Sequence, residues 1–182
     1  MRELSLHVLD LLENSVRAGA GQVFVTVSEW PERGRLVIRV EDDGPGLAVP
    51  LEHALDPFYT TKPGSRVGLG LSLLRDSAEQ AGSKLRLGRS RHGGLLVEAT
   101  MQLSHIDRLP LGDLGLTFGT LAGTHPELEI GCLLVRGDRR REIRLSQLRA
   151  ELPPERRNNG LVLAGQMTAR VQQGLKDLGV TA

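Results

Sequence analysis

The stretch VEDDGPG, residues 40–46, ends a β-branched segment with acidic residues and then places two glycines around a proline. Aspartate, glycine and proline all favour turns, so an ordinary turn after a strand is one interpretation. The other is a binding site, because the Asp42 carboxylate can accept a hydrogen bond from an exocyclic amine. Gly44 and Gly46 would let a flat ring approach the backbone. Under both interpretations a strand ends here and a loop begins.

The segments around this stretch alternate between helical and strand-like patterns. Apolar residues recur at helical spacing before it, and two β-branched segments flank a turn-prone WPERG, residues 30–34. In chain order we expect a helix over 4–16, strands over 23–27 and 36–40, a long loop over 42–67 with a short helix near 51–55, a helix over 68–80, and strands over 84–88 and 95–103. This order predicts a two-layer α/β sandwich, with helices on one face of a mixed or antiparallel sheet.

The chain changes character after residue 104, so we expect two parts. Residues 1–104 would form the sandwich, and residues 105–182 a small α/β extension of unknown role. In the extension we expect a helix over 111–122, a hairpin pairing 130–135 with 142–145, and a final helix over 161–178. We find no cofactor loop or ligand cluster in this second part.

Composition excludes several classes of protein. The 182 residues carry 23 Lys and Arg against 22 Asp and Glu, a net charge of +1, so the usual electrostatic footprint of a nucleic-acid binder is absent. The single cysteine, Cys132, excludes a disulfide framework and a cysteine-based metal cluster, and we expect it to pack inside the hairpin. No stretch approaches the ~18 apolar residues of a membrane span. We therefore expect a cytoplasmic protein.

The first helix carries a polar stripe, because Asp10, Asn14 and Arg17 lie at positions i, i+4 and i+7. One interpretation is a solvated helix face with supporting side-chain pairs. The other is a ligand site, since Asn14 is a poor helix former and its amide oxygen suits Mg²⁺. His7 precedes this stripe, and we expect it to pack in the fold rather than accept a phosphoryl group.

A second glycine-rich segment, GLGL at residues 68–71, begins a helix. A helix N-terminus with free backbone amides and a positive dipole end suits phosphates. Thr61 and Lys62 lie on the loop that leads to it. The segment is not a P-loop, because Gly-Lys-Ser/Thr does not follow at the required gap.

Four stretches resemble, in order, the N, G1, F and G2 boxes of the GHKL superfamily, the ATP-binding domain of histidine kinases, gyrase B and mismatch-repair MutL proteins. They are LLENSVR at 11–17, VEDDGPGL at 40–47, DPFYTTK at 56–62 and GLGLSLL at 68–74. The resemblance covers the chain to about residue 103. It implies the two-layer Bergerat fold.

The resemblance also implies a role for individual residues. Asn14 would bind Mg²⁺ and bridge it to ATP, Arg17 would contact phosphate, and Asp42 would bind the adenine amino group. Gly44 and Gly46 would flank the adenine. The lid and phosphate grip would comprise Thr61, Lys62, Gly68, Leu69, Gly70 and Leu71. Arg66 departs from the pattern, since histidine kinases usually carry a further glycine there, which leaves the lid conformation open.

Asp10 decides the expected chemistry. The superfamily's hydrolases and serine kinases typically have glutamate four residues before the magnesium asparagine, as general base, whereas histidine kinases have a non-acidic residue. Asp10 is one methylene shorter, so an attacking hydroxyl or water must sit closer. The resemblance thus implies a Mg²⁺-dependent ATP-binding protein that transfers the γ-phosphate to a protein or to water in a regulatory system.

Two alternatives stay open. The first is a regulatory module that uses ATP only as a conformational ligand and orders a partner surface. The second is a MutL-like protein of DNA transactions, which the absence of a visible basic groove disfavours. For the ATP-dependent function implied by the resemblance we expect a protein partner, with a second copy of the chain as one candidate, and neither nucleic acid nor membrane.

Overall fold

The structure, a computed structural model, describes residues 3–47 and 69–180. Its helices are α1 (Leu4–Arg17), α3 (Leu69–Gln80), α4 (Leu114–Thr124), α5 (Leu145–Glu151) and α6 (Gly160–Leu178). Its strands are β1 (Gln22–Trp30), β2 (Arg35–Asp42), β3 (Lys84–Arg89), β4 (Leu95–Gln102), β5 (Glu129–Arg136) and β6 (Arg139–Arg144). Two short 3₁₀ helices span Pro31–Arg33 and Pro154–Arg156.

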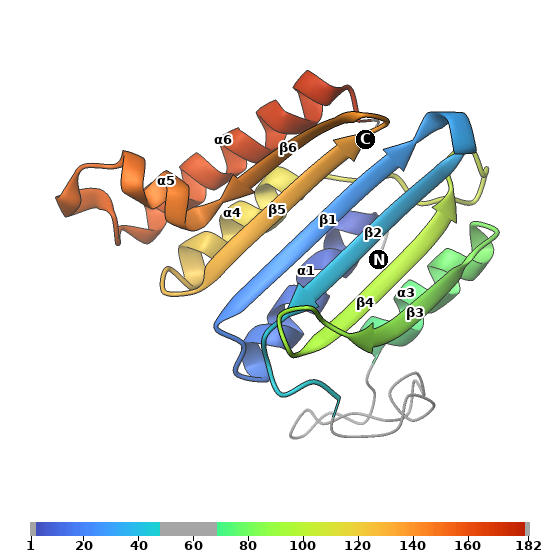
Figure 1. The fold of residues 1–182 in the computed structure, drawn as a ribbon, viewed down its shortest axis with the longest axis horizontal. Helices are drawn as coiled ribbons and strands as arrows, with labels where there is room; N and C mark the ends of the chain where they lie inside the picture. Colours follow the sequence, from blue (N-terminus) through green and yellow to red (C-terminus); the bar gives the residue numbers. More distant parts are fainter. Residues whose placement is uncertain (1–2, 48–68, 181–182) are drawn as a thin grey trace.

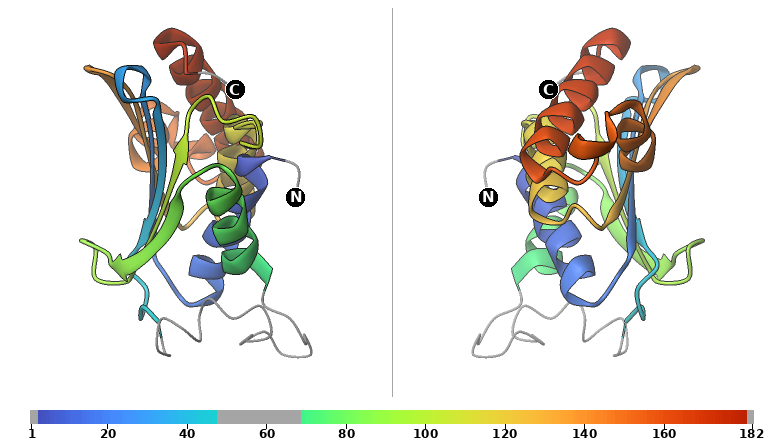
Figure 2. Two further views of the ribbon diagram at one scale, coloured as in Figure 1. Left: turned by 90° about the vertical axis from the view of Figure 1, so that its right-hand side faces the viewer. Right: turned by 90° about the vertical axis from the view of Figure 1, so that its left-hand side faces the viewer.

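The strands form one mixed sheet in the order β3-β4-β2-β1-β5-β6 (Figure 1). β1 and β5 are parallel, and every other neighbouring pair is antiparallel. Helices α1, α3, α4 and α6 cover one face, and Figure 2 shows no helix of the described chain covering the other. The predicted two-layer α/β sandwich is therefore confirmed.

The alternation of side chains explains the two faces of the sheet. Val23, Val25 and Val27 of β1 are fully buried on the helix side, whereas Thr26 and Ser28 are only half-buried on the other. Successive side chains of a strand point to opposite faces, so one face of β1 joins the core and the other meets solvent. The helices complete the core with their apolar stripes, which removes this surface from water.

The segment after residue 104 continues the same sheet, because β5 pairs with β1 along its whole length. The predicted hairpin forms between β5 and β6, but Leu145 begins α5 instead of ending a strand. Helix α5 was not predicted, since it has only two turns and little periodicity. Cys132 of β5 is fully buried, as expected, and burial raises the pKa of its thiol.

Helices α4 and α6 pack closely through glycines. A Cβ atom built on Gly119 of α4 would lie 1.9 Å from Thr168 Oγ1 and 2.8 Å from the Ala164 carbonyl oxygen of α6. The residue at this position must therefore lack a side chain for the two helix backbones to approach this closely. This contact fixes α4 and α6 over β5 and β6.

Candidate functional site

Four elements meet at one end of the molecule. The C-terminal end of α1, the end of β2, the turn between β3 and β4, and the start of α3 all lie there (Figures 1 and 2). The sequence predicts polar residues at two of these places, on α1 and after β2. The fold brings the two sets together.

Asp42 ends β2 and is almost completely buried, with 5% of its surface exposed. Its Oδ2 accepts a hydrogen bond of 2.6 Å from Ser15 Oγ of α1. Its Oδ1 accepts two more, from the backbone N–H groups of Gly44 at 3.0 Å and Leu95 at 2.9 Å. A carboxylate has about four acceptor positions, so these three bonds hold the group in place and leave one direction for a further donor.

Gly94 closes the site from the side of the β3–β4 turn. Its N–H donates to the Asp42 carbonyl oxygen at 3.1 Å. A Cβ atom built on Gly94 would lie 2.1 Å from Asp42 Oδ1 and 2.6 Å from the Gly44 nitrogen. Any other residue would displace the carboxylate, which gives this glycine a role in shaping the site.

Asp10, Asn14 and Arg17 form a continuous hydrogen-bonded row along α1, as their spacing predicts. Asn14 Nδ2 donates to Asp10 Oδ2 at 3.2 Å, and Arg17 Nη2 donates to Asn14 Oδ1 at 2.6 Å. A carboxylate accepts and a guanidinium donates, so the two partners fix which end of the Asn14 amide is the oxygen. That oxygen faces the exposed end of the row, where Arg17 lies.

Asp43 fastens the loop between α1 and β1 to the end of β2. Its Oδ1 accepts hydrogen bonds of 2.8 Å from the backbone N–H groups of both Gly21 and Gln22. Because this loop follows Arg17 directly, the contact holds the C-terminal end of α1 against the end of β2. Asp43 is thus a supporting residue of the site.

Sequence reasoning missed Ser15 and Gly94. Ser15 is buried on the apolar side of α1, so a polar residue at a core position was the available indication. Gly94 belongs to a His92-Gly93-Gly94 turn, whose glycines alone indicate only a turn. Its contact with Asp42 joins residues 52 positions apart, and no local pattern predicts such a contact.

The remaining predicted residues divide into three groups. Gly46 follows the site with a φ of +76°, a conformation that favours glycine. Leu69 and Gly70 lie in the first turn of α3, and Leu71 packs partly buried against the core. Thr61, Lys62, Gly68 and Arg66, with the whole DPFYTTK stretch and the expected short helix, lie outside the described residues.

No group of three or more histidine, cysteine, aspartate or glutamate residues able to hold a metal occurs within residues 3–47 and 69–180. His7, as expected, packs in the fold, where its Nε2 lies 3.4 Å from Ser77 Oγ of α3.

The model of the histidine kinase-, DNA gyrase B-, and HSP90-like ATPase family matches residues 2–105 of the chain. The chain belongs to this family. The match contains every site residue described above, from Asp10 to Gly94. The sheet extension formed by β5 and β6 lies beyond it.

Histidine kinase-like sensor proteins are among the curated relatives. The sensor protein ChvG of Agrobacterium fabrum is 36% identical over 88 residues, which is 43% of this chain and 14% of ChvG. The sensor protein kinase PilS of Pseudomonas aeruginosa is 33% identical over 98 residues, 50% of this chain and 18% of PilS. The chain thus spans less than a fifth of the length of these two relatives.

A solved structure extends the likeness of the fold. The N-terminal domain of a DNA repair protein superposes with a TM-score of 0.51 and 13% identity, covering 79% of this chain and 52% of that one. This likeness concerns the fold alone.

In the described part of the chain, none of the helices has the length and apolar character that a bilayer span requires.

Proposed function

We propose that this chain binds ATP with Mg²⁺ where α1 meets the end of β2, and passes the γ-phosphate to a protein or to water within a regulatory system. The observation that carries the proposal is the buried Asp42 carboxylate, which three hydrogen bonds hold with one acceptor direction left. Members of the family share an ATPase domain, and the site occupies the matched residues.

Asp42 would select the adenine base. A buried carboxylate that cannot rotate presents its remaining lone pair in one fixed direction, which suits a single exocyclic amine. Gly44 and Gly46 leave the backbone beside it free of side chains, so a flat ring can lie against the main chain. The recognition would therefore depend on hydrogen bonding at one edge of the ring and on contact with its face.

Asn14 is suited to hold Mg²⁺. Mg²⁺ takes oxygen ligands, keeps several waters and is often bound by one or two protein groups together with substrate phosphates. A single amide oxygen without an acidic cluster fits that pattern. In the structure Arg17 occupies the Asn14 oxygen, so ligand binding would require Arg17 to turn away, toward the phosphates. The bound ion would neutralise part of the negative charge of the phosphates.

Asp10 is the candidate general base. Its carboxylate accepts from Asn14 and would orient a hydroxyl or water toward the γ-phosphate. The same hydrogen bond supports the alternative function, an ATP-sensing module without catalysis, since in that case Asp10 only positions Asn14. Lys62 and Thr61, with the start of α3 at Gly68 to Leu71, would complete the phosphate grip in both functions.

The partner would be a protein that accepts the phosphoryl group or responds to the bound nucleotide, with a second copy of the chain as one candidate. ATP is the phosphoryl donor of the cytoplasm, so the proposal places the activity there.

One experiment tests the function directly. The purified chain is incubated with Mg²⁺ and γ-labelled ATP, alone and with cell extract, and bound nucleotide, released phosphate and labelled protein are measured. A parallel incubation with excess EDTA is the control for metal dependence. We expect binding, and label in phosphate or in protein only with Mg²⁺. Binding without either product would leave the sensor function, and the absence of ATP binding would refute both.

A further inference from the structure

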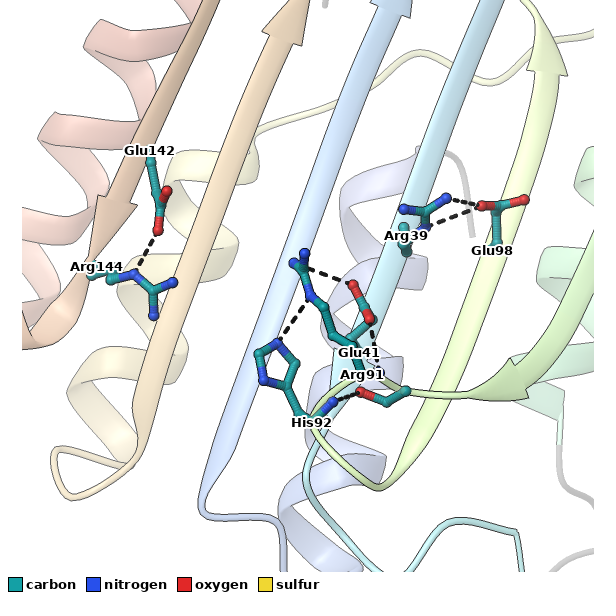
Figure 3. Close-up of polar contacts among 8 residues, drawn as sticks. Arg39, Glu41, Arg91, His92, Glu98, Glu142 and Arg144 are labelled. Carbon is teal, nitrogen blue, oxygen red and sulfur yellow. Dashed lines mark hydrogen bonds and ion pairs between the residues drawn. The ribbon is translucent and has the colours of Figure 1, made fainter.

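The face of the sheet opposite the helices contains a hollow of about 510 Å³ that extends over β1 to β4. Side chains of alternate strand residues line it, including Arg39 of β2 and Glu98 of β4. Figure 3 shows these two in front of the strands, with the helices behind. The hollow therefore lies on the other side of the sheet from Asp42 and α1.

The hollow is strongly cationic although the whole chain carries a net charge of only +1. Its lining includes Arg35, Arg39, Lys84 and Arg86 against one acid, Glu98. Glu98 forms an ion pair with Arg39. Arg35, Lys84 and Arg86 are exposed, and within residues 3–47 and 69–180 they form no ion pair with a carboxylate. An anion at this face would meet three cations that are not held in ion pairs by the described carboxylates.

The strand register arranges the cations in rows. Arg39 and Arg86 both lie opposite Glu98, Lys84 lies opposite Thr100, and Arg35 lies opposite Gln102. These three rows are two residues apart along β4, which corresponds to roughly 6.6 Å per step. In an extended peptide, the side chains on one side also follow one another at roughly 6.6 Å, because every second residue faces the same way. The rows therefore match carboxylates at alternate positions of an extended segment.

The hollow fits a protein segment better than a nucleic acid. Glu98 lies between Arg39 and Arg86, so a continuous row of phosphates would meet a carboxylate within the site. A peptide can place a neutral donor at that point and acids at the next two alternate positions, against Lys84 and Arg35. Trp30 and the hydroxyl groups of Thr26 and Ser28 line the rest and offer contacts that do not depend on charge.

We propose that this hollow docks an extended acidic segment of a partner protein, with a neutral donor opposite Glu98 and carboxylates at the next two alternate positions, against the Lys84 and Arg35 rows. The site is separate from the Asp42 site and does not depend on nucleotide binding. It gives the domain a place to hold a partner on the face that the helices leave open.

Trp30 makes the test direct, because it is the only tryptophan of the chain and lines the hollow. The probe is an unlabelled twelve-residue peptide, two repeats of Ser-Ser-Asp-Ser-Asp-Ser, which on one side of an extended chain presents one serine followed by two aspartates. Its binding to the full chain is followed by Trp30 fluorescence and by protection of that fluorescence from acrylamide quenching. A lysine–serine peptide of the same length and a twelve-nucleotide oligothymidylate are measured alongside. We expect the acidic peptide to bind and protect Trp30, more weakly as salt rises.

Two charge-reversed double variants distinguish binding in the hollow from a general effect of the net charge of the chain. Arg35→Glu combined with Arg86→Glu changes the hollow, whereas Arg156→Glu combined with Lys176→Glu makes the same change of net charge at exposed positions on other elements. We expect the first to weaken peptide binding by roughly tenfold or more and the second by less than about twofold. Lys84→Glu is measured as well, in case the first variant fails to fold.

Equal losses in the two double variants would overturn the proposal, as would tighter binding of the oligothymidylate or no response of Trp30. ATP affinity is measured calorimetrically on the same samples. Peptide binding without ATP binding would support the docking site and refute the proposed nucleotide function. ATP binding without peptide binding would support the nucleotide function and refute the docking site.

Discussion

Ser15 of α1 donates a hydrogen bond of 2.6 Å to the Asp42 carboxylate at the end of β2. Asn14 precedes Ser15 and points about 100° away around the same helix. The bond therefore fixes the rotation of α1 about its axis, and with it the direction in which Asn14 faces. The buried hydrogen bond between Ser15 and Asp42, on the core side of α1, thus positions Asn14, the candidate metal ligand, on the other side of the helix.

Asp42→Asn should abolish most nucleotide affinity without unfolding the chain. The amide oxygen can still accept from the Gly44 and Leu95 N–H groups, and its nitrogen can donate to Ser15 Oγ, which also accepts. The position that is left for the adenine amine then carries an N–H donor of the amide instead of a carboxylate lone pair. Loss of one charge-assisted hydrogen bond corresponds to roughly 1.5–3 kcal/mol, or about tenfold to a hundredfold in ATP affinity by calorimetry. Unchanged affinity would remove Asp42 from the site.

Asn14→Ala should weaken Mg-ATP much more than metal-free ATP, because the amide oxygen is the proposed magnesium ligand. Affinities are measured calorimetrically with Mg²⁺ and with EDTA. Arg17 also loses its partner, so Arg17→Ala is the matched variant and should weaken both forms of the nucleotide. Equal losses for Asn14→Ala with and without the ion would argue against the metal role.

Asp10→Asn separates catalysis from sensing. If Asp10 is the general base, ATP affinity should stay nearly intact while turnover falls by roughly 10²- to 10⁴-fold. If the chain is a sensor and Asp10 is only a helix-surface partner of Asn14, there is no turnover to lose. The melting temperature should then shift slightly, as expected for a pair worth a few tenths of a kcal/mol. Nucleotide affinity, phosphate release and melting temperature are measured on the same variant. A wild-type chain without turnover would exclude the catalytic role.

Gly119→Ala should destabilise the fold by roughly 1–3 kcal/mol, because the new methyl group would overlap Thr168 and the Ala164 carbonyl oxygen. Gly165→Ala is the control on the facing helix. A Cβ atom there meets nothing within 4 Å, so this change should stabilise the chain by roughly 0.5–1 kcal/mol. Urea unfolding followed by circular dichroism measures both. Equal effects would contradict the close packing of α4 and α6.

His7 should make stability depend on pH. Burial lowers the pKa of its imidazole below the ordinary value of 6.5, and its Nδ1 has no hydrogen-bond partner in the described part of the chain. The unfolded chain therefore takes up a proton first as the pH falls. The stability contribution of neutral His7 is complete above pH 6.5 and declines below it. Between pH 7 and pH 5 the free energy of unfolding of His7→Leu should fall less than that of the unchanged chain. Equal falls in the two proteins would contradict a buried, neutral His7.

Local sequence patterns predicted most of the elements around the site. The apolar spacing over 4–16 predicted α1, and the β-branched segments predicted β1 and β2. These patterns depend on neighbours within a few residues, because helix and strand periodicity decide which side chains share a face. The same reasoning placed Asp10, Asn14 and Arg17 in one row, and the structure confirms that row. Helix α5 is too short for such a pattern, so it was missed.

By itself the sequence determined most of the element types, the helix-on-one-face architecture and the family, since these follow from periodicity and from motifs in a fixed order. Only the tertiary structure decided what meets across the chain. It placed Ser15 and Gly94 around Asp42, set β5 beside β1, and gathered Arg35, Lys84 and Arg86 on one face. The pleat exposes alternate residues and the strand order joins distant segments, so cations that are far apart in a chain of net charge +1 form one cationic surface.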